Sequence, residues 1–187
     1  MLRSLLPLLI AALPGFGTPL IALAEEQLAL FSADGYRQTQ YRSPTPPSIE
    51  GAKTLDTPAL QALLENQPDV VLVDVYRSQW LAGRFIDSEP HANLPGSLWL
   101  ANTGDGNLQP EWASYFSDNL AQASQGNLER PMVFYCRSDC WLGWNATRRA
   151  QALGYTQLYW YRDGVDGWEQ AGLPLHPATP EPLPADG

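Results

Sequence analysis

Residues 135–144, with the sequence YCRSDCWLGW, contain both cysteines of the chain, Cys136 and Cys140. Residues four apart on a first helical turn lie about 5–6 Å from each other, near the usual disulfide span of about 4.4–6.8 Å. The pair can therefore be a structural disulfide, two ligands of a metal ion, or a reactive thiol with a resolving partner. The spacing alone leaves these three interpretations open.

The elements around the cysteines alternate between short apolar strands and amphipathic helices. Strands are expected at residues 52–55, 69–75, 96–100, 131–135 and 157–161. Helices are expected at residues 57–67, 78–85, 110–124, 142–154 and 164–172. This alternation predicts a single α/β domain with a parallel five-stranded sheet and helices on both faces.

Cys136 follows the strand 131–135 directly and precedes a helix. Ligands of such sheets bind beyond the carboxyl ends of the strands, and a helix N-terminus carries partial positive charge and free N–H groups. Backbone amides of residues 137–141 would stabilise a thiolate or a persulfide on Cys136. We therefore expect Cys136 to be the reactive sulfur and Cys140 its resolving partner.

Other kinds of site find less support in the sequence. His91 and His176 are the only histidines, and neither stands at ligand spacing from the cysteines, so we expect no metal and no other cofactor. A phosphatase loop would need an arginine where Leu142 stands. Asp74, at the end of the second strand, is expected to hold a loop by accepting backbone N–H bonds.

Residues 1–24 are typical of a cleaved export signal peptide. Arg3 precedes an apolar run that is broken by prolines and glycines, and Ala22-Leu23-Ala24 is a small-x-small cleavage site. A retained membrane anchor is the alternative, but a spanning helix needs about 20 unbroken apolar residues. We expect a periplasmic protein that is not embedded in the membrane after signal cleavage.

The remaining segments flank one domain at residues 51–177. Residues 25–50 form a Tyr-Arg and Pro-rich extension, either an arm packed on the domain or a strap that docks a partner. Residues 178–187 form a Pro-rich tail, which we expect to be disordered. The net charge of −9, without a basic stripe, argues against nucleic acid as a partner.

Four motifs resemble the rhodanese-like family and occur in the order of that family. They are LVDVYRSQWLAGRFI, LPGSLWL, VFYCRSDCW and ALGYTQLYWYRDGVDGWEQAGLPL. This resemblance covers roughly residues 51–177 and implies a rhodanese-like fold, with a parallel five-stranded sheet covered on both faces. It also implies that Cys136 occupies the sulfur-carrying position of the active-site loop, residues 136–141.

A narrower resemblance concerns the export signal, the Tyr-Arg repeat and the loop. Together they resemble the PQQ-dependent catabolism-associated CXXCW motif proteins, although the spacing here is Cys-x-x-x-Cys-Trp. That resemblance implies an exported accessory protein of PQQ-dependent alcohol oxidation. Its partner would be a periplasmic quinoprotein dehydrogenase or the electron carrier of that enzyme.

The chain also departs from the family pattern. Tyr76 stands where the family has arginine, Arg84 stands where it has histidine, and residues 87–93 are inserted. In the loop, Asp139 would repel thiosulfate and Trp141 is bulky, which argues against thiosulfate turnover but leaves thiol chemistry open.

The sequence thus predicts a small sulfur or thiol substrate, catalytic Cys136 and Cys140, and substrate contacts from four residues of the loop, Arg137, Ser138, Asp139 and Trp141. Cys136 would carry sulfur as a persulfide, or the pair would cycle between dithiol and disulfide. A disulfide leaves no thiolate to carry sulfur, so the two chemistries exclude each other at any instant. The alternative is a non-catalytic docking module with a structural disulfide.

Overall fold

The protein has a central parallel sheet that confirms the predicted fold class. The computed structural model describes residues 30–86 and 90–183, so the expected signal peptide lies outside the described residues. The sheet has the order β1-β8-β7-β2-β6, and every pairing in it is parallel. Its strands are β1 (Lys53–Leu55), β2 (Val71–Asp74), β6 (Leu98–Trp99), β7 (Met132–Tyr135) and β8 (Leu158–Tyr161).

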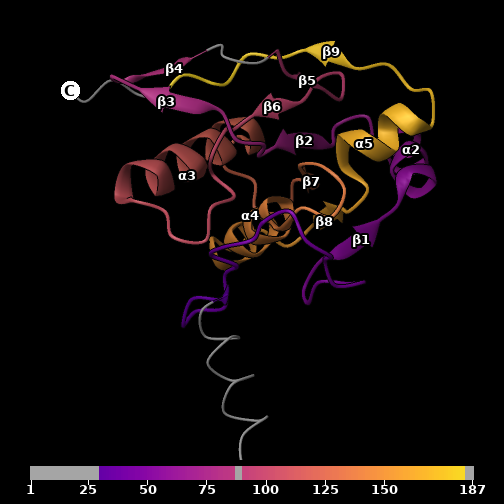
Figure 1. Ribbon diagram of the computed structural model, residues 1–187. Coiled ribbons are helices and arrows are strands. Elements are labelled where there is room, and N and C mark those ends of the chain that lie inside the picture. Colours follow the sequence, from indigo (N-terminus) through magenta and orange to yellow (C-terminus); the bar gives the residue numbers. More distant parts are fainter. Residues whose placement is uncertain (1–29, 87–89, 184–187) are drawn as a thin grey trace, which may run out of the picture.

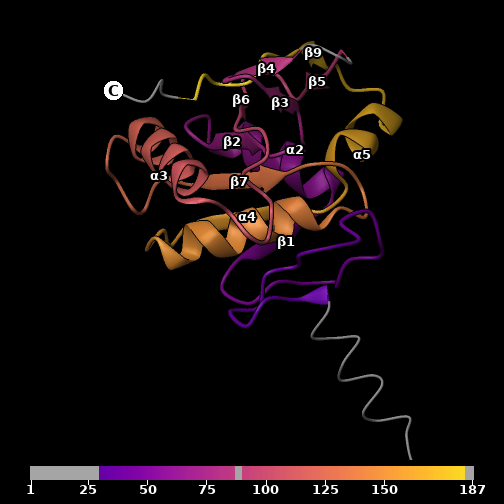
Figure 2. The ribbon, with the colours of Figure 1, turned by 60° about the vertical axis from the view of Figure 1, so that its left-hand side comes forward.

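Helices cover both faces of this sheet (Figures 1 and 2). On one face lie α3 (Pro110–Ser124) and α4 (Trp141–Ala152), and on the other lie α2 (Thr57–Asn66) and α5 (Gly164–Gln170). In β7, Met132 and Phe134 pack toward α3 and α4, whereas Val133 and Tyr135 pack toward α2 and α5. Both faces of the strand are buried, which explains its continuous apolar sequence.

The segment 78–85, predicted as a helix, is instead a β-hairpin. It consists of β3 (Gln79–Leu81) and β4 (Arg84–Ile86), joined by Ala82 and Gly83 with φ angles of +50° and +76°. Two consecutive positive φ angles are typical of a tight hairpin turn. Trp80 and Phe85 face each other across the hairpin with ring centroids 4.7 Å apart, so cross-strand aromatic packing stabilises it.

The expectation of a disordered tail is wrong for residues 178–183. β9 (His176–Pro177) pairs with β5 (Ala92–Asn93), and the chain then continues along the domain. The amide of Glu181 donates to the carbonyl oxygen of Trp99 at 3.0 Å, and the Glu181 carbonyl oxygen accepts the Tyr115 hydroxyl at 2.8 Å. Residues 184–187 lie outside the described residues.

Residues 30–50, called the arm below, pack along α4. Phe31 and Ile49 of the arm contact a cluster of tryptophans, Trp141, Trp144 and Trp160. The described part of the extension therefore contributes to the core of the domain.

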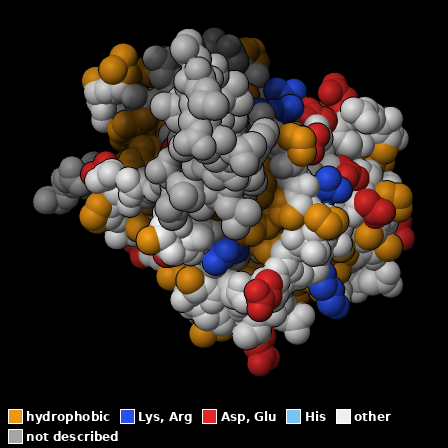
Figure 3. Space-filling view, turned by 60° about the horizontal axis from the view of Figure 1, so that its bottom comes forward, with side chains coloured by type: hydrophobic (Ala, Val, Ile, Leu, Met, Phe, Trp, Pro, Cys, Tyr) orange, Lys and Arg blue, Asp and Glu red, His pale blue; other side chains and the backbone are white. Residues whose placement is uncertain are grey.

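Charges of both signs are interspersed on the face that Figure 3 shows. On the face shown in Figure 3, Lys and Arg side chains alternate with Asp and Glu side chains, and neither sign forms a continuous patch. Within residues 30–86 and 90–183, no helix has the length and apolar composition that crossing a bilayer requires.

The packing of α3 on the sheet can be tested with a matched pair of leucines. Leu120 on α3 is fully buried, whereas Leu128 is 46% exposed. Leu120→Ala should lower the free energy of unfolding by about 2–5 kcal/mol, because it leaves a cavity between α3 and the sheet. Leu128→Ala should change it by less than about 0.5 kcal/mol. Urea titrations of both variants measure this, and equal effects would contradict the packing described.

Candidate active site at the cysteine loop

The cysteine loop lies at the carboxyl edge of the sheet, as predicted. β7 ends at Tyr135, Cys136 follows, and Cys140 is the N-cap residue of α4. The two cysteines form a disulfide, with their Cα atoms 6.3 Å apart. The described part of the chain therefore contains no free thiol. The two cysteines are only 2% and 3% exposed, so the disulfide is almost completely buried.

The carboxylate of Asp166 holds the loop in place. It accepts hydrogen bonds from the Ser138 amide at 3.0 Å, the Ser138 hydroxyl at 2.8 Å and Nε of Arg137 at 3.0 Å. Burial alone would raise the pKa of the Asp166 carboxyl, but the bonds from Ser138 and Arg137 outweigh it and hold that pKa below its ordinary value. Asp166 is therefore an anionic anchor for the loop.

α5 also touches the loop through its backbone. The Val165 amide donates to the carbonyl oxygen of Cys136 at 3.1 Å. Gly164 has a φ of +59°, and a Cβ atom there would lie 2.6 Å from Cα of Arg137 and 2.7 Å from the Cys136 carbonyl oxygen. Only glycine allows the chain to approach the loop this closely.

In this oxidised state, two amides of the predicted cradle for the Cys136 sulfur have other acceptors. The Ser138 amide donates to Asp166, and the Trp141 amide donates to the Tyr41 carbonyl oxygen at 2.9 Å. Each of these N–H groups already has an oxygen partner that is part of the tertiary structure. The sequence could not show this, because both partners lie far from the loop along the chain.

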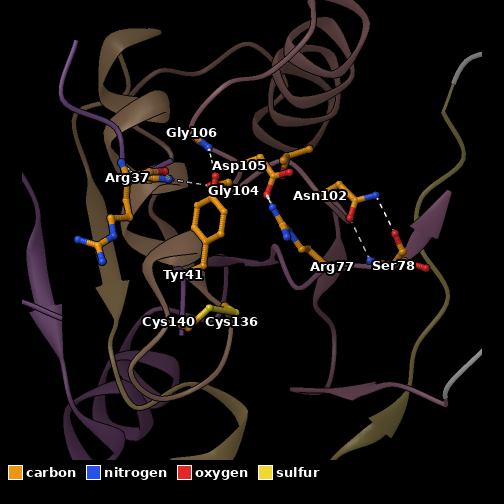
Figure 4. A network of polar contacts seen from close by, with 12 residues as sticks. Arg37, Tyr41, Arg77, Ser78, Asn102, Gly104, Asp105, Gly106, Cys136 and Cys140 are labelled. Carbon is orange, nitrogen blue, oxygen red and sulfur yellow. Dashed lines mark hydrogen bonds and ion pairs between the residues drawn. A yellow bond between two sulfur atoms is a disulfide. The ribbon is translucent and has the colours of Figure 1, made fainter. Parts of the chain in front are cut away.

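The arm crosses the loop as an extended segment. Arg42 and Cys140 form an antiparallel bridge, in which the Ser43 amide donates to the Asp139 carbonyl oxygen at 3.0 Å. The Tyr41 hydroxyl accepts the Gly106 amide at 2.9 Å, and Figure 4 shows the Tyr41 side chain beside the disulfide. The arm is therefore a wall of the site.

A buried amide anchors the arm. Asn145 on α4 is fully buried, and its Oδ1 accepts the Arg37 amide at 2.9 Å. Its Nδ2 donates to the carbonyl oxygens of Arg37 at 2.8 Å and Gly104 at 2.9 Å. One side chain thus joins the arm, α4 and the loop that precedes α3, and each of its polar atoms has a partner.

Two cavities flank the loop. A polar cleft of about 750 Å³ is lined among others by Tyr76, His91, Trp99, Arg137 and Asp166. A second cavity, of about 560 Å³, is lined by seven residues: Gln40, Tyr41, Arg42, Tyr76, Arg77, Cys140 and Leu142. Tyr76 and Arg77 contribute to both, so the two cavities adjoin at these side chains.

The predicted substrate-binding residues have different surroundings. Arg137 lines the polar cleft, while Ser138, Asp139 and Trp141 line neither cavity. Ser138 is bonded to Asp166, and Asp139 is exposed. Trp141 is 8% exposed and lies under the arm, where its Nε1 donates to the Ser43 hydroxyl at 3.0 Å. Trp141 therefore packs the arm against α4.

Asp74 has the expected role and an additional partner. Its Oδ1 accepts the Tyr76 amide at 2.9 Å, and its Oδ2 lies 2.6 Å from Nε2 of His91. Burial raises the pKa of the Asp74 carboxyl, and the contact with His91 opposes this rise. The His91 ring stacks on Tyr76, with centroids 4.9 Å apart. Only the departure from the family pattern at residues 87–93 pointed to this segment.

Sequence reasoning also missed two ion pairs. Asp166 binds the loop from α5, and Asp105 pairs with Arg77 at 2.6 Å (Figure 4). The sequence gives no sign of these contacts, because the partners are far apart along the chain. Asp105 lies 28 residues from Arg77, and Asp166 lies 28 residues from Ser138. Among residues 30–86 and 90–183, no cluster of three His, Cys, Asp or Glu side chains could hold a metal ion.

Comparison with known proteins identifies a family. The profile described as rhodanese-like domain matches residues 56–171. No curated protein matches the chain.

Three solved structures illustrate the likeness. The polysulfide-sulfur transferase homodimer of Wolinella succinogenes is 18% identical, with a TM-score of 0.45, over 67% of this chain and 79% of that one. Thiosulfate sulfurtransferase of Pseudomonas aeruginosa is 17% identical, with a TM-score of 0.47, over 73% and 22% of the two chains. The human single-domain sulfurtransferase TSTD1 is 26% identical, with a TM-score of 0.43, over 64% and 96%.

The contact between α5 and the loop predicts the effect of Gly164→Ala. The new Cβ must displace the loop, so we expect a loss of at least about 1 kcal/mol of stability and faster opening of the disulfide by dithiothreitol. Gly126→Ala is the matched control, since Gly126 has a φ of +75° but no atom within 4 Å of an added Cβ. Urea titration and thiol alkylation measure both variants. Equal opening rates would contradict the contact.

Asp166 predicts a defined pH dependence of stability. Its folded pKa lies below that of the unfolded chain, which is about 4, so its contribution is present above pH 4 and is lost as the pH falls through the folded pKa. The difference in unfolding free energy between the wild type and Asp166→Asn should be constant from about pH 5 to 7 and shrink below about pH 4. A difference that stays constant down to pH 3 would contradict this ionisation.

Proposed function

The chain belongs to the rhodanese-like domain family, and we propose that it performs thiol–disulfide exchange through the Cys136–Cys140 pair. The observation that carries this proposal is the disulfide itself, which joins the residue after β7 to the N-cap of α4 and has Cys140 in a cavity wall. In this state Cys136 has no thiolate with which to carry sulfur. The oxidised form is therefore an electron acceptor for thiols.

Sulfur transfer is the second chemistry of the same site. Membership of the rhodanese-like family supports sulfur or thiol chemistry in general. Once the disulfide is reduced, the Cys136 thiolate can take a sulfane sulfur atom from a polysulfide, which leaves with one sulfur fewer. The Cys140 thiolate can then attack Sγ of Cys136 in the resulting persulfide. That attack releases sulfide and restores the disulfide, so the two chemistries alternate at one site.

The setting that we propose is the periplasm. The signal-like residues 1–24 support export, and the Tyr-Arg repeat with the Cys-x-x-x-Cys-Trp loop supports a role beside PQQ-dependent alcohol oxidation. Exported proteins meet oxidising conditions, in which a disulfide persists. A periplasmic quinoprotein dehydrogenase or its electron carrier would then take electrons from the reduced pair.

The near-complete burial of both sulfurs favours a competing proposal, a docking module with an inert disulfide. The two proposals differ in how easily a dithiol should reduce the disulfide. Buried disulfides that no thiol reaches resist mild dithiols, whereas a working pair opens and closes reversibly.

The test uses intact mass after alkylation. Protein taken from the periplasm should carry a disulfide. Dithiothreitol at low millimolar concentration should free two thiols that can be alkylated. Without alkylation, the two thiols should form the disulfide again when the dithiol is removed. The Cys136→Ser/Cys140→Ser double variant controls for other sites and should gain no alkyl group. A disulfide that stays closed under native conditions would contradict thiol–disulfide exchange and would leave the inert disulfide of the docking module.

The same assay tests sulfur transfer. Reduced protein incubated with polysulfide should gain the mass of one sulfur atom on Cys136, and Cys140→Ser should retain that sulfur longer because the resolving thiol is missing. Cys136→Ser should gain none. Sulfur found on Cys140 but not on Cys136 would contradict the assignment of Cys136 as the carrier.

A further inference from the structure

The two sulfurs of the disulfide differ in their relation to the cavities. Cys140 lines the 560 Å³ cavity between the arm and the segment that follows β2, together with Tyr41 and Tyr76. Cys136 lines neither this cavity nor the polar cleft. Of the two cysteines, Cys140 is therefore the one that borders a cavity.

We infer that Cys140 is the sulfur attacked by the substrate, and that the substrate is a small thiol carrying an additional anionic group. This inference rests on the thiol–disulfide exchange proposed above and specifies which sulfur begins it. It reverses the order expected from the sequence, in which Cys136 reacts first and Cys140 resolves.

The anionic group is inferred from the charged residues of the cavity wall. Arg42 and Arg77 are the charged residues that line it, and their side chains are 54% and 50% exposed. Arg42 lies 3.6 Å from Asp166, and Arg77 lies 2.6 Å from Asp105. Both guanidinium groups thus stand at the solvent side of a cavity whose other walls include Tyr41 and Leu142.

The two acidic partners are shared with further arginines. Asp166 also pairs with Arg137 at 3.0 Å. The Asp105 carboxylate also interacts electrostatically with Arg149, whose Nη2 donates to the Asp105 carbonyl oxygen at 2.7 Å. Each of these two carboxylates is thus shared by two guanidinium groups, so the arginines at the cavity are only partly neutralised.

This local excess of positive charge contrasts with the net charge of −9 of the whole chain. Asp139, which the sequence suggested would repel an anion, is exposed and lines neither cavity. The local field therefore favours an anion at this entrance, although the protein as a whole repels one.

The substrate thiol is the reductant in the exchange reaction. The substrate thiolate attacks Sγ of Cys140, the Cys136–Cys140 bond breaks, and its electron pair leaves on Sγ of Cys136. A mixed disulfide between substrate and Cys140 results. A second substrate thiolate attacks the substrate sulfur of this mixed disulfide, which releases the substrate disulfide and leaves two reduced cysteines. Two electrons have then passed to the protein.

The first experiment maps the mixed disulfide. Oxidised full-length protein is mixed briefly with 2-mercaptoethanesulfonate, quenched with acid and N-ethylmaleimide, and digested for mass spectrometry. We expect the thiol adduct on Cys140 and the maleimide on Cys136. The reverse pattern would overturn the inference while leaving thiol–disulfide exchange intact. Absence of any adduct or freed thiol would overturn both.

The second experiment measures charge preference with thiols of similar size. At equal thiolate concentration and low salt, the disulfide should open about fivefold faster with the anionic 2-mercaptoethanesulfonate than with the neutral 2-mercaptoethanol. It should open more slowly with the cationic cysteamine than with 2-mercaptoethanol. Salt should weaken this preference, because it screens exposed charges. Equal rates for the three thiols would overturn the anionic specificity.

Variants at the cavity entrance identify the source of the preference. Arg42→Gln, at a half-exposed position, should reduce the ratio of the two rates to about twofold, and Arg42→Gln/Arg77→Gln should abolish it. The matched control is Arg84→Gln on β4, which removes an exposed arginine that lines neither cavity and should leave the ratio unchanged. A preference that survives in the double variant would show that these arginines do not select the substrate.

Discussion

Asp166 accepts hydrogen bonds from the backbone, the hydroxyl and the guanidinium of the cysteine loop, and the conformation of that loop depends on this one carboxylate. Asp166 lies two residues after Gly164 on α5, and this glycine lets the chain pass against the loop backbone. With Ser138 and Arg137 held by α5, Cys136 and Cys140 lie at a distance that a disulfide spans. The geometry of the cysteine pair is therefore coupled to the packing of α5 on the sheet.

The site is formed by the arm together with the cysteine loop, and not by the loop alone. Asn145 is buried with every polar atom satisfied, and two of its three bonds go to the backbone of Arg37. Loss of those bonds would leave a buried amide without partners, which costs about 1–3 kcal/mol for each unsatisfied group. The arm is therefore held at Arg37, and from there Tyr41 and Arg42 reach the cavity beside Cys140.

A second cysteine changes what a rhodanese-like site can do. A single thiol at the end of β7 can only carry a group, whereas a pair can also store two electrons. The arrangement around the pair fits this use: Cys140 reaches a cavity wall, and the guanidinium groups of Arg42 and Arg77 border that cavity. In the oxidised state, the Ser138 and Trp141 amides donate to the Asp166 carboxylate and the Tyr41 carbonyl oxygen.

The sequence by itself determined the parallel sheet, the four helices that cover it and the edge at which the cysteines lie, because hydrophobic periodicity and the order of elements are local properties. It failed at the hairpin of β3 and β4, where the turn conformation of Ala82 and Gly83 overrides an ambiguous pattern. Only the tertiary structure decided that Asp166 holds the loop, that His91 pairs with Asp74, and that the arm borders the cavity at Cys140. These contacts join residues that are distant along the chain, and charge and hydrogen bonding between such residues leave no periodic signal in a single sequence.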